Sequence, residues 1–390
     1  MLIIENGTVY TPEQVIPDGA VFIDGRRIHA VAKRGDMAIP PKAQHLDAHR
    51  GAIVPGFVDM HIHGVNGHDL MDARIASLQA MAFSLPRYGV TAFVPTTVPA
   101  KLESIGQALK TVRKAMGNEM PGAEILGVHV EGPYLSAQER GAHSLDMLAT
   151  PQADDFPIFL ESADVIRSFT LAPELPGAVE LIRALKERGI LVSAGHSSAI
   201  DTDMERAVEA GLSHVTHMFC NMSTLRRANL RRVAGVVEFT LLDDRLTTEV
   251  IGDGYHISPT LMKLALKTKG PERLAVVTDA NSLTGMPPGS YRVWGIDVIL
   301  EESIIYVADR SAYAGSVATM DRCLRWLIES VGVSFHDALC MITKTPATIL
   351  NLANRKGSLE AGMDADLVIL DQNQNVAQTI VAGQVTFTRT

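Results

Sequence analysis

Residues 53–63 read IVPGFVDMHIH, an apolar run of strand length that ends in polar residues. Further short apolar runs follow at similar intervals, beginning near Val90, Ile125, Ser168, Ile190, Ser213, Thr248 and Leu274. Amphipathic helical stretches lie between most of these runs, at 101–115, 177–188, 201–210 and 258–267, and a later helix at 320–329 follows the last run. Buried strands that alternate with helices at this spacing predict an α/β fold, a (β/α)8 TIM-type barrel.

The two ends of the chain have a different sequence pattern from the middle, with strand-like runs and turns. The first fifty residues contain short strand-like runs, with Asp24-Gly25 placed as a hairpin turn, and the last 34 residues again read strand, turn, strand. We therefore expect a small β-sandwich domain formed from both termini. Its predicted parts are residues 1–54 and 355–390, and the barrel domain is predicted at 55–354.

Composition excludes several classes of protein. Of the 390 residues, 46% are hydrophobic and 20% are charged, so a large core forms and general disorder is excluded. The net charge of -9 argues against nucleic-acid binding. We expect no membrane role, because no apolar run is long enough to span a bilayer. Three cysteines without CxxC spacing and an N-terminus unlike a signal peptide indicate a reduced, cytoplasmic protein.

Polar residues end most of the predicted strands. They are His61 and His63, Glu131, His196, His217, Asp253 with His256, and Asp279. In a barrel of this type the carboxyl ends of all strands meet at one mouth, where catalysis takes place. We therefore expect these side chains to converge.

The strand-end residues include ligands that suit a metal. His61 and His63 stand two apart on a strand, so both imidazoles point to the same side. An HxH pair alone is also common among packed histidines, but Glu131, His196 and His217 complete a set that is typical of catalytic zinc. The sequence therefore predicts a divalent metal, zinc or alternatively iron.

Asp279 ends the apolar run LAVVT and is the candidate acid/base. An ionised aspartate beside a metal can take a proton from water and return it to a leaving amine. Alternatively, Asp279 caps the start of a helix. The GHSSA segment lacks the final glycine of a nucleophile elbow, which excludes a serine hydrolase. The phosphate-binding motifs GxxxxGK[ST] and GxGxxG do not occur, so nucleotide binding has no support.

These motifs resemble a known family. PGFVDMHIHG at 55–64 resembles the first strand of the amidohydrolase superfamily. The blocks HVEGPYLSAQERGAH at 129–143, LAPE at 171–174, SAGHSSA at 193–199, THMF at 216–219, DGYH at 253–256 and TDA at 278–280 are more narrowly similar to the N-acetylglucosamine-6-phosphate deacetylase family. The resemblance covers essentially the whole chain.

The resemblance implies hydrolysis of the N-acetyl group of an N-acetylhexosamine 6-phosphate in a homodimer. It implies that Glu131, His196 and His217 bind one metal ion, and that Asp279 is the acid/base. The family varies at the HxH pair, and its presence as His61 and His63 leaves room for a second ion, bridged by Glu131, with Asp279 beside it, so we expect one or two ions per subunit. By the same analogy, His143 binds the substrate and polarises its acetyl carbonyl, and His256 contacts the sugar or phosphate.

One segment departs from the family pattern. The run CNMSTLRRANLRRVAG, residues 220–235, is longer than the family's loop. Asn221, Arg227 and Arg232 are its candidate substrate-binding residues, because guanidinium groups bind phosphate in a bidentate manner. A solvated basic loop is the alternative. In the family, the corresponding arginine reaches into a neighbouring subunit's site.

Other functions remain as alternatives. One is a deacetylase of another hexosamine, such as N-acetylgalactosamine 6-phosphate, and another is a different amidohydrolase deacylase. Cyclic-amide hydrolases usually carry a lysine on strand four, and SFTLAPE at 168–174 has none. A non-enzymatic sugar-phosphate regulator on a degenerate barrel predicts missing ligands, and none is missing.

Overall fold

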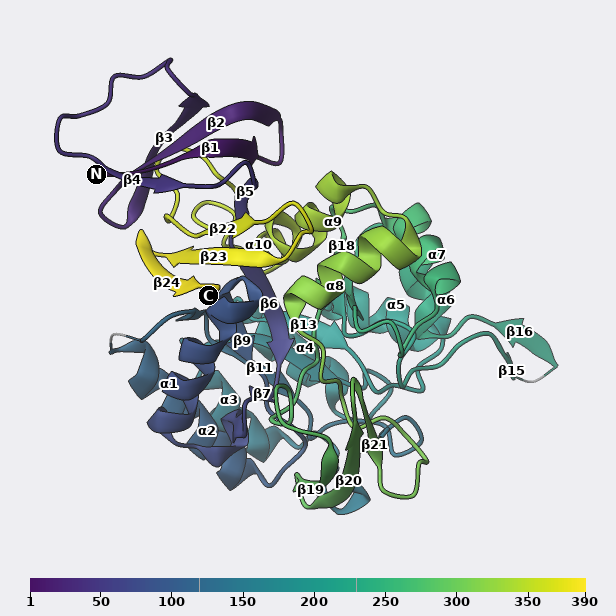
Figure 1. The fold of residues 1–390 in the computed structure, drawn as a ribbon. Helices are drawn as coiled ribbons and strands as arrows, with labels where there is room; N and C mark the ends of the chain where they lie inside the picture. The colour runs from purple at the N-terminus through teal and green to yellow at the C-terminus, as the bar shows by residue number, and fades with distance from the viewer. Residues whose placement is uncertain (119, 229) are drawn as a thin grey trace.

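A barrel of eight parallel strands forms the centre of the molecule (Figure 1). The computed structural model describes residues 1–118, 120–228 and 230–390. The barrel strands, in chain and spatial order, are β6 (Phe57–Ile62), β9 (Val90–Pro95), β11 (Val128–Glu131), β12 (Ile166–Leu171), β13 (Leu191–Ala194), β14 (His214–Val215), β17 (Thr247–Ile251) and β18 (Leu274–Val277). Bridges between Thr96 and His129 and between Ile62 and Ala280 complete the ring. The predicted α/β fold is confirmed, and single bridges join its two parallel sheets into the barrel.

Helices cover the outside of the barrel and bury apolar side chains against it. In α2, Ile105, Leu109 and Val112 follow helical spacing and are buried against the strands. The helices are α1 (Ile75–Ser84), α2 (Leu102–Met116), α3 (Phe156–Leu160), α4 (Ala178–Glu187), α5 (Asp201–Ala210), α6 (Val236–Leu242), α7 (Pro259–Lys269), α8 (Met320–Trp326), α9 (Phe335–Ile342) and α10 (Lys344–Ile349). Among the described residues, no helix combines the length and apolarity needed to cross a bilayer.

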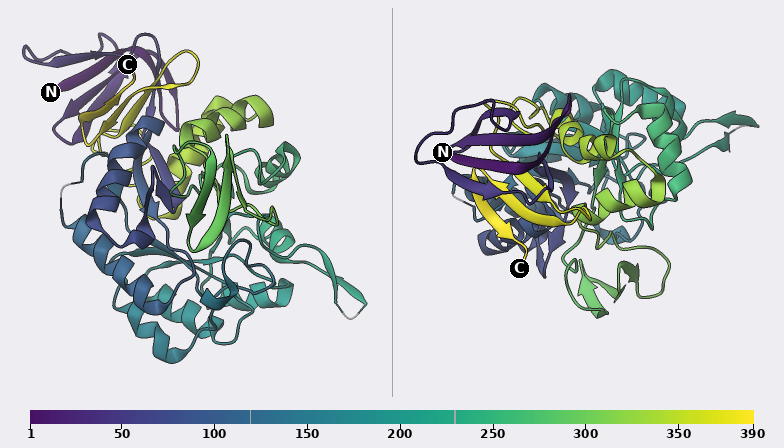
Figure 2. Two further views of the ribbon diagram at one scale, coloured as in Figure 1. Left: turned by 60° about the horizontal axis from the view of Figure 1, so that its bottom comes forward. Right: turned by 45° about the horizontal axis from the view of Figure 1, so that its top comes forward.

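Both chain ends pair in one sheet beside the barrel (Figure 2). Its strands are β1 (Leu2–Tyr10), β2 (Val15–Asp24), β3 (Arg27–Lys33), β4 (Gln44–Asp47), β5 (Ala52–Pro55), β22 (Leu367–Leu370), β23 (Val376–Val381) and β24 (Gln384–Thr388). Val368 of β22 lies opposite Val54 of β5, so the C-terminal strands continue the N-terminal sheet. The buried residues Ile4, Val21 and Leu367 belong to its apolar core. The domain boundaries given above stay a prediction.

Two additions lie outside the regular barrel. A short hairpin, β15 (Arg226–Ala228) with β16 (Arg231–Val233), projects from the body (Figures 1 and 2). A three-stranded antiparallel sheet follows β18: β19 (Gly289–Val293), β20 (Ile296–Glu301) and β21 (Ile304–Val307). Short pairs β7 (Gly64–Val65) with β8 (His68–Asp69), and β10 (Glu124–Ile125) beside β9, complete the strands.

Candidate metal centre and active site

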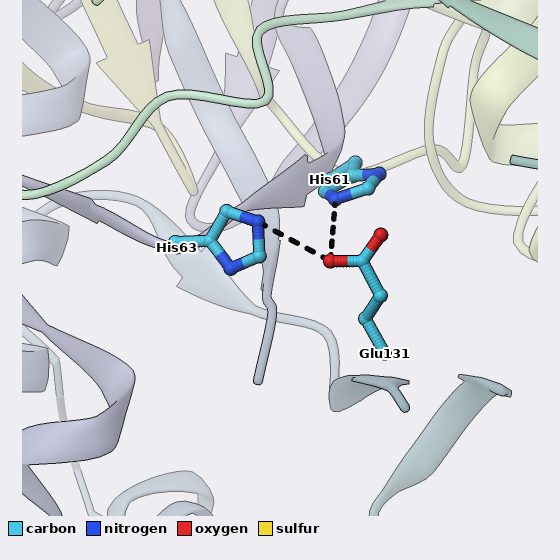
Figure 3. Close-up of side chains that lie close together, drawn as sticks. All are labelled: His61, His63 and Glu131. Atoms are coloured by element: carbon cyan, nitrogen blue, oxygen red, sulfur yellow. Dashed lines mark ion pairs between the residues drawn. The ribbon is translucent and has the colours of Figure 1, made fainter. Parts of the chain in front are cut away.

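Glu131 lies at the centre of a ring of histidines at the carboxyl ends of the strands. Its Oε1 is 3.1 Å from Nε2 of His217 and 3.4 Å from Nε2 of His196. Its Oε2 is 3.5 Å from Nε2 of His63 and 3.7 Å from Nε2 of His61 (Figure 3). The structure thus brings together residues from β6, β11 and the ends of β13 and β14, and each carboxylate oxygen faces a different pair of imidazoles.

Strained backbone follows three of the strands at this mouth. His196, His217 and Asp279 have φ angles of 46°, 29° and 49°, in the left-handed region that non-glycine residues rarely adopt. Such conformations cost about 1–3 kcal/mol each and are concentrated at functional sites. The turns direct these side chains into the mouth instead of along the barrel wall.

Hydrogen bonds fix the orientation of three imidazoles. Nδ1 of His61 lies 2.6 Å from Oε1 of Glu249, and Nδ1 of His63 lies 3.2 Å from the Thr96 carbonyl oxygen. Nδ1 of His196 lies 2.8 Å from the carbonyl oxygen of Glu139. Each of these oxygens accepts a hydrogen bond from an Nδ1–H group, so the Nε2 lone pair of the neutral imidazole faces Glu131.

The donor set fits a divalent cation. Two ligands about 2.1 Å from a tetrahedral ion lie about 3.4 Å from each other, which matches the separations around Glu131. Among the described residues, Nε2 of the fully buried His61 makes no hydrogen bond, and Nδ1 of His217 makes none either. His61, His63 and Glu131 form one group that could hold an ion, and Glu131, His143 and His196 form another. Imidazole and carboxylate ligands of this kind suit zinc or iron.

Asp279 completes this centre. Its Oδ1 lies 3.1 Å from Nε2 of His63 and 3.3 Å from Nε2 of His61. Burial alone would raise the pKa of Asp279, but the positive charges and hydrogen bonds of these histidines, when they are protonated, lower it to about 2. The carboxylate is therefore ionised at neutral pH and can accept a proton.

His143 faces the same space from the loop that follows β11. Its ring centroid is 4.9 Å from that of His196. Burial, followed by the charge of His196, lowers the pKa of His143 to about 3. A neutral imidazole at this position can donate one hydrogen bond to a carbonyl oxygen without carrying charge.

Glu249, in β17, is a further buried carboxylate, which the strand-end pattern does not predict. Besides His61, its Oε2 lies 3.4 Å from Nε2 of His214. Burial would raise its pKa, but the charge of His61 and these hydrogen bonds hold it well below its ordinary value. The one sequence signal for it is an acid in the middle of TTEVI, a run whose other residues are all β-branched and favour a strand.

A cavity opens above the metal centre. Its lining includes His143, Asn221, Ile251, His256, Trp294 and Tyr313. Nδ1 of His256 lies 2.7 Å from Oδ2 of Asp253, and this carboxylate outweighs burial and raises the pKa of His256. Trp294 and Tyr313 come from the added sheet and the segment after it, and the sequence did not single them out.

The predicted arginines lie elsewhere. Arg227 and Arg232 are exposed on the projecting hairpin, opposite each other in its register. Among the described residues, neither lines the cavity of its own chain. His129 and His214 are buried within their strands and hydrogen-bonded, as expected for core histidines: Nε2 of His129 lies 2.7 Å from Thr170 Oγ1.

Comparison with known proteins supports this architecture. The model of the amidohydrolase family matches residues 52–386. The chain is 34% identical to N-acetylglucosamine-6-phosphate deacetylase of Bacillus subtilis, covering 99% of this chain and 97% of that protein. It is 33% identical to N-acetylgalactosamine-6-phosphate deacetylase of Escherichia coli O157:H7, covering 89% and 90%.

A solved structure extends the similarity to three dimensions. N-acetyl-D-glucosamine-6-phosphate deacetylase of Mycobacterium smegmatis, a variant in complex with N-acetyl-D-glucosamine-6-phosphate, superimposes with a TM-score of 0.90. The two sequences are 30% identical, and the match covers 99% of each chain. By sequence and by structure, the chain belongs to the amidohydrolase family, among the homologues of N-acetylglucosamine-6-phosphate deacetylase.

Proposed function

We propose that this chain hydrolyses the N-acetyl group of N-acetylglucosamine 6-phosphate, giving the amino-sugar phosphate and acetate. One observation carries the proposal: ionised Asp279 lies within 3.3 Å of two imidazoles that share Glu131 with two more, at the mouth of the barrel. Metal-assisted hydrolysis of an amide needs this combination of ligands and base. The relatives described above are named as deacetylases of N-acetylated amino-sugar phosphates.

Glu131 and the four histidines around it would hold one or two divalent ions, most simply zinc. Its Oε1 faces His196 and His217, and its Oε2 faces His61 and His63, so the two halves of the carboxylate have separate partners. Asp279 is a further ligand on the side of His61 and His63. Divalent ions in this set supply Lewis acidity, which polarises an amide carbonyl and makes water more acidic.

Two side chains of the protein then polarise the carbonyl group and transfer the protons. The ring N–H of neutral His143 donates to the acetyl oxygen, where negative charge develops; losing one such donor costs about 2.7–4 kcal/mol. The carboxylate of Asp279 takes one proton from water as the water oxygen bonds to the carbonyl carbon. Asp279 then gives this proton to the sugar nitrogen, the C–N bond breaks, and the acid product ionises to acetate.

The sugar phosphate is proposed to lie toward Asn221 and His256. The raised pKa of His256 favours a cation there, which suits sugar hydroxyl or phosphate oxygens. Arg232 and Arg227 do not reach this cavity within one chain, so we propose a homodimer in which the hairpin of one subunit serves the cavity of the other. The exposed Leu225 and Leu230 on this hairpin, 59% and 82% exposed, support a contact with another copy.

N-acetylgalactosamine 6-phosphate is the second candidate substrate. The chain is 33% identical to the N-acetylgalactosamine-6-phosphate deacetylase of Escherichia coli over 89% of its length, and this similarity supports the second substrate. The two sugars differ in one hydroxyl orientation, so the choice depends on contacts at the His256 side of the cavity.

Acetate release from purified, zinc-loaded protein tests the proposal. N-acetylglucosamine, N-acetylgalactosamine and N-acetylmannosamine are compared, each with and without 6-phosphate. We expect the highest kcat/KM with N-acetylglucosamine 6-phosphate. Asp279→Asn should lower kcat at least about a hundredfold, while elemental analysis still finds at least one equivalent of bound metal, because Glu131, His196 and His217 are intact. Absence of acetate from all six sugars would contradict the proposal, and an active Asp279→Asn would reject the assigned base.

A further inference from the structure

Trp294 occupies a backbone position that disfavours it. It forms, with Gly295, the two-residue turn between β19 and β20, where Val293 pairs with Ile296. The φ angles of Trp294 and Gly295 are 51° and 84°, so both turn residues lie in the left-handed region. Turns of this kind favour Asn-Gly, and a bulky side chain at the first position is a strained choice. A strained residue beside an active site points to a function for its side chain.

The indole is held in place at both ends of its ring system. Nε1 donates to Oδ2 of Asp69 over 3.0 Å. At the far edge, Cη2 lies 3.8 Å from the position that a Cβ on Gly315 would occupy, so the ring nearly touches that glycine. The ring centroid is 5.0 Å from that of His63, in an edge arrangement. Trp294 is therefore a fixed wall of the cavity, not a mobile surface residue.

Polar and apolar groups both line the cavity. His256 and Asn221 supply polar groups. Trp294 and Ala142 supply apolar surface, and both pack against the apolar cluster of the added sheet. The nitrogen and the methyl group of an acetyl carbonyl carbon placed between His143 and Asp279 diverge, so they meet different parts of the lining. If the nitrogen and the sugar extend toward His256 and Asn221, the acyl chain extends toward Trp294.

We propose that Trp294 sets the length of the acyl group that the enzyme removes, and that it limits the substrate to N-acetyl and similarly short N-acyl sugars. This inference rests on the proposed hydrolysis of N-acetylglucosamine 6-phosphate and adds the acyl specificity. The indole closes the space beyond the acetyl methyl group, so longer chains meet the ring before their carbonyl reaches Asp279. Discrimination by one methylene in an apolar pocket reaches about tenfold or more.

Trp294→Asn is the sharpest test because asparagine suits the turn while it opens the wall. We would measure kcat/KM for the N-acetyl, N-propionyl and N-butyryl forms of glucosamine 6-phosphate. The wild type should prefer acetyl over butyryl by at least about a hundredfold, and the variant should reduce this preference at least about tenfold. Trp294→Phe, which keeps a smaller ring, should give an intermediate preference and covers the case in which the asparagine variant fails to fold.

Tyr291→Ala is the matched control. Tyr291 lies in β19 of the same sheet, with its hydroxyl donating to the Pro287 carbonyl, and it does not line the cavity. Its removal should leave the acyl preference unchanged. An unchanged preference in folded Trp294→Asn and Trp294→Phe would overturn the inference while the proposed function stands. A wild type that releases acetate from no hexosamine phosphate would instead reject the proposed function.

Discussion

Glu249 lies beneath the metal centre and acts on it through one histidine. Its carboxylate is buried, and Oε1 is 2.6 Å from Nδ1 of His61. A carboxylate acceptor on the distal nitrogen fixes the tautomer of a metal-binding imidazole and increases its basicity. The same carboxylate lies 3.4 Å from the backbone nitrogen of His217 and from Nε2 of His214, so it ties β17 to β6 and β14. Glu249 is therefore a positioning residue for the metal ligands.

Glu249→Gln should weaken metal binding. The amide keeps the shape but loses the charge that favours a proton on Nδ1 of His61, so we expect a tenfold to hundredfold rise in metal Kd, about 1.4–2.8 kcal/mol. Competition with a chromophoric chelator measures this directly, without an activity assay. Glu124→Gln, the same change on β10 outside this cluster, serves as the control and should leave Kd unchanged. Equal affinities in Glu249→Gln and wild type would remove Glu249 from this role.

The strand-end residues could be read from the sequence, but their supporting partners could not. Glu131, His196 and Asp279 follow apolar runs of regular spacing, and barrel geometry alone predicts that they converge. Glu249 is inside a strand, and its contact with His61 depends on the register of strands 188 residues apart. Trp294 reaches the cavity from a turn whose position depends on the packing of a whole sheet. Neither the register between distant strands nor the packing of that sheet can be recognised from the residues that surround Glu249 or Trp294 in the sequence.

Contacts within one subunit do not explain why the hairpin of β15 and β16 projects from the barrel with four arginines. It carries Arg226, Arg227, Arg231 and Arg232 on strands that lie outside the body of the barrel (Figure 1). Arg226 donates to the Ser198 carbonyl oxygen, but in the described parts of the chain no carboxylate pairs with these four arginines. Guanidinium groups gathered in this way repel one another and gain stability from an anion. The proposed dimer supplies that anion as the substrate phosphate bound in the other subunit.

Arg232→Ala should raise KM for phosphorylated sugars about tenfold to a hundredfold, because a charge-assisted hydrogen bond to phosphate is lost, and should affect the non-phosphorylated sugar far less. Steady-state kinetics on the pair of substrates measures the difference. Equal effects on both sugars would exclude a role in phosphate binding.

A mixed dimer shows which subunit uses the arginine. When Arg232→Ala and Asp279→Asn chains are co-expressed, one site of each hybrid keeps both Asp279 and an intact Arg232 from the partner. Hybrid dimers should therefore regain about half of the wild-type activity at low substrate concentration. Activity no higher than the mean of the two parent variants would show that the arginine serves its own chain or none.

Elements with internal periodicity could be predicted, and the additions between them could not. The helix predicted at 201–210 begins and ends as α5 does, because its apolar residues follow the 3.6-residue period. The predicted loop at 220–235 forms a hairpin, since paired strands of three residues are too short to show alternation. The sheet at 289–307 was not assigned, although GSYRVWGIDVILEE alternates around a Trp-Gly turn.

At the scale of the molecule, a partly buried ion cluster joins the barrel to the terminal sheet. Nζ of Lys356 lies 2.6 Å from Glu124, 2.9 Å from Asp364 and 2.5 Å from Asp366, and its side chain is 3% exposed. Arg355 also pairs with Glu124 and Asp364. Glu124 belongs to the barrel side in β10, and Asp366 directly precedes β22 of the sheet. Charges buried in this way are costly unless every member is paired, so the cluster couples the two parts of the fold.

The acid stability of the whole protein should therefore depend on Glu124. Burial would raise its pKa, but Arg355 and Lys356 lower it from 4.5 to about 2. Because the folded state favours the ionised form, its contribution is complete above pH about 4.5 and is lost as the pH falls toward 2. Glu124→Gln should lower the free energy of unfolding at pH 7 by roughly 1–2 kcal/mol, a value reduced because the side chain is 37% exposed.

Thermal unfolding of wild type and Glu124→Gln should show a Tm difference at pH 7 that becomes smaller by pH 3. The exposed Glu209→Gln should show no difference at either pH, and a Glu124→Gln difference that stays constant with pH would contradict the role of this carboxylate.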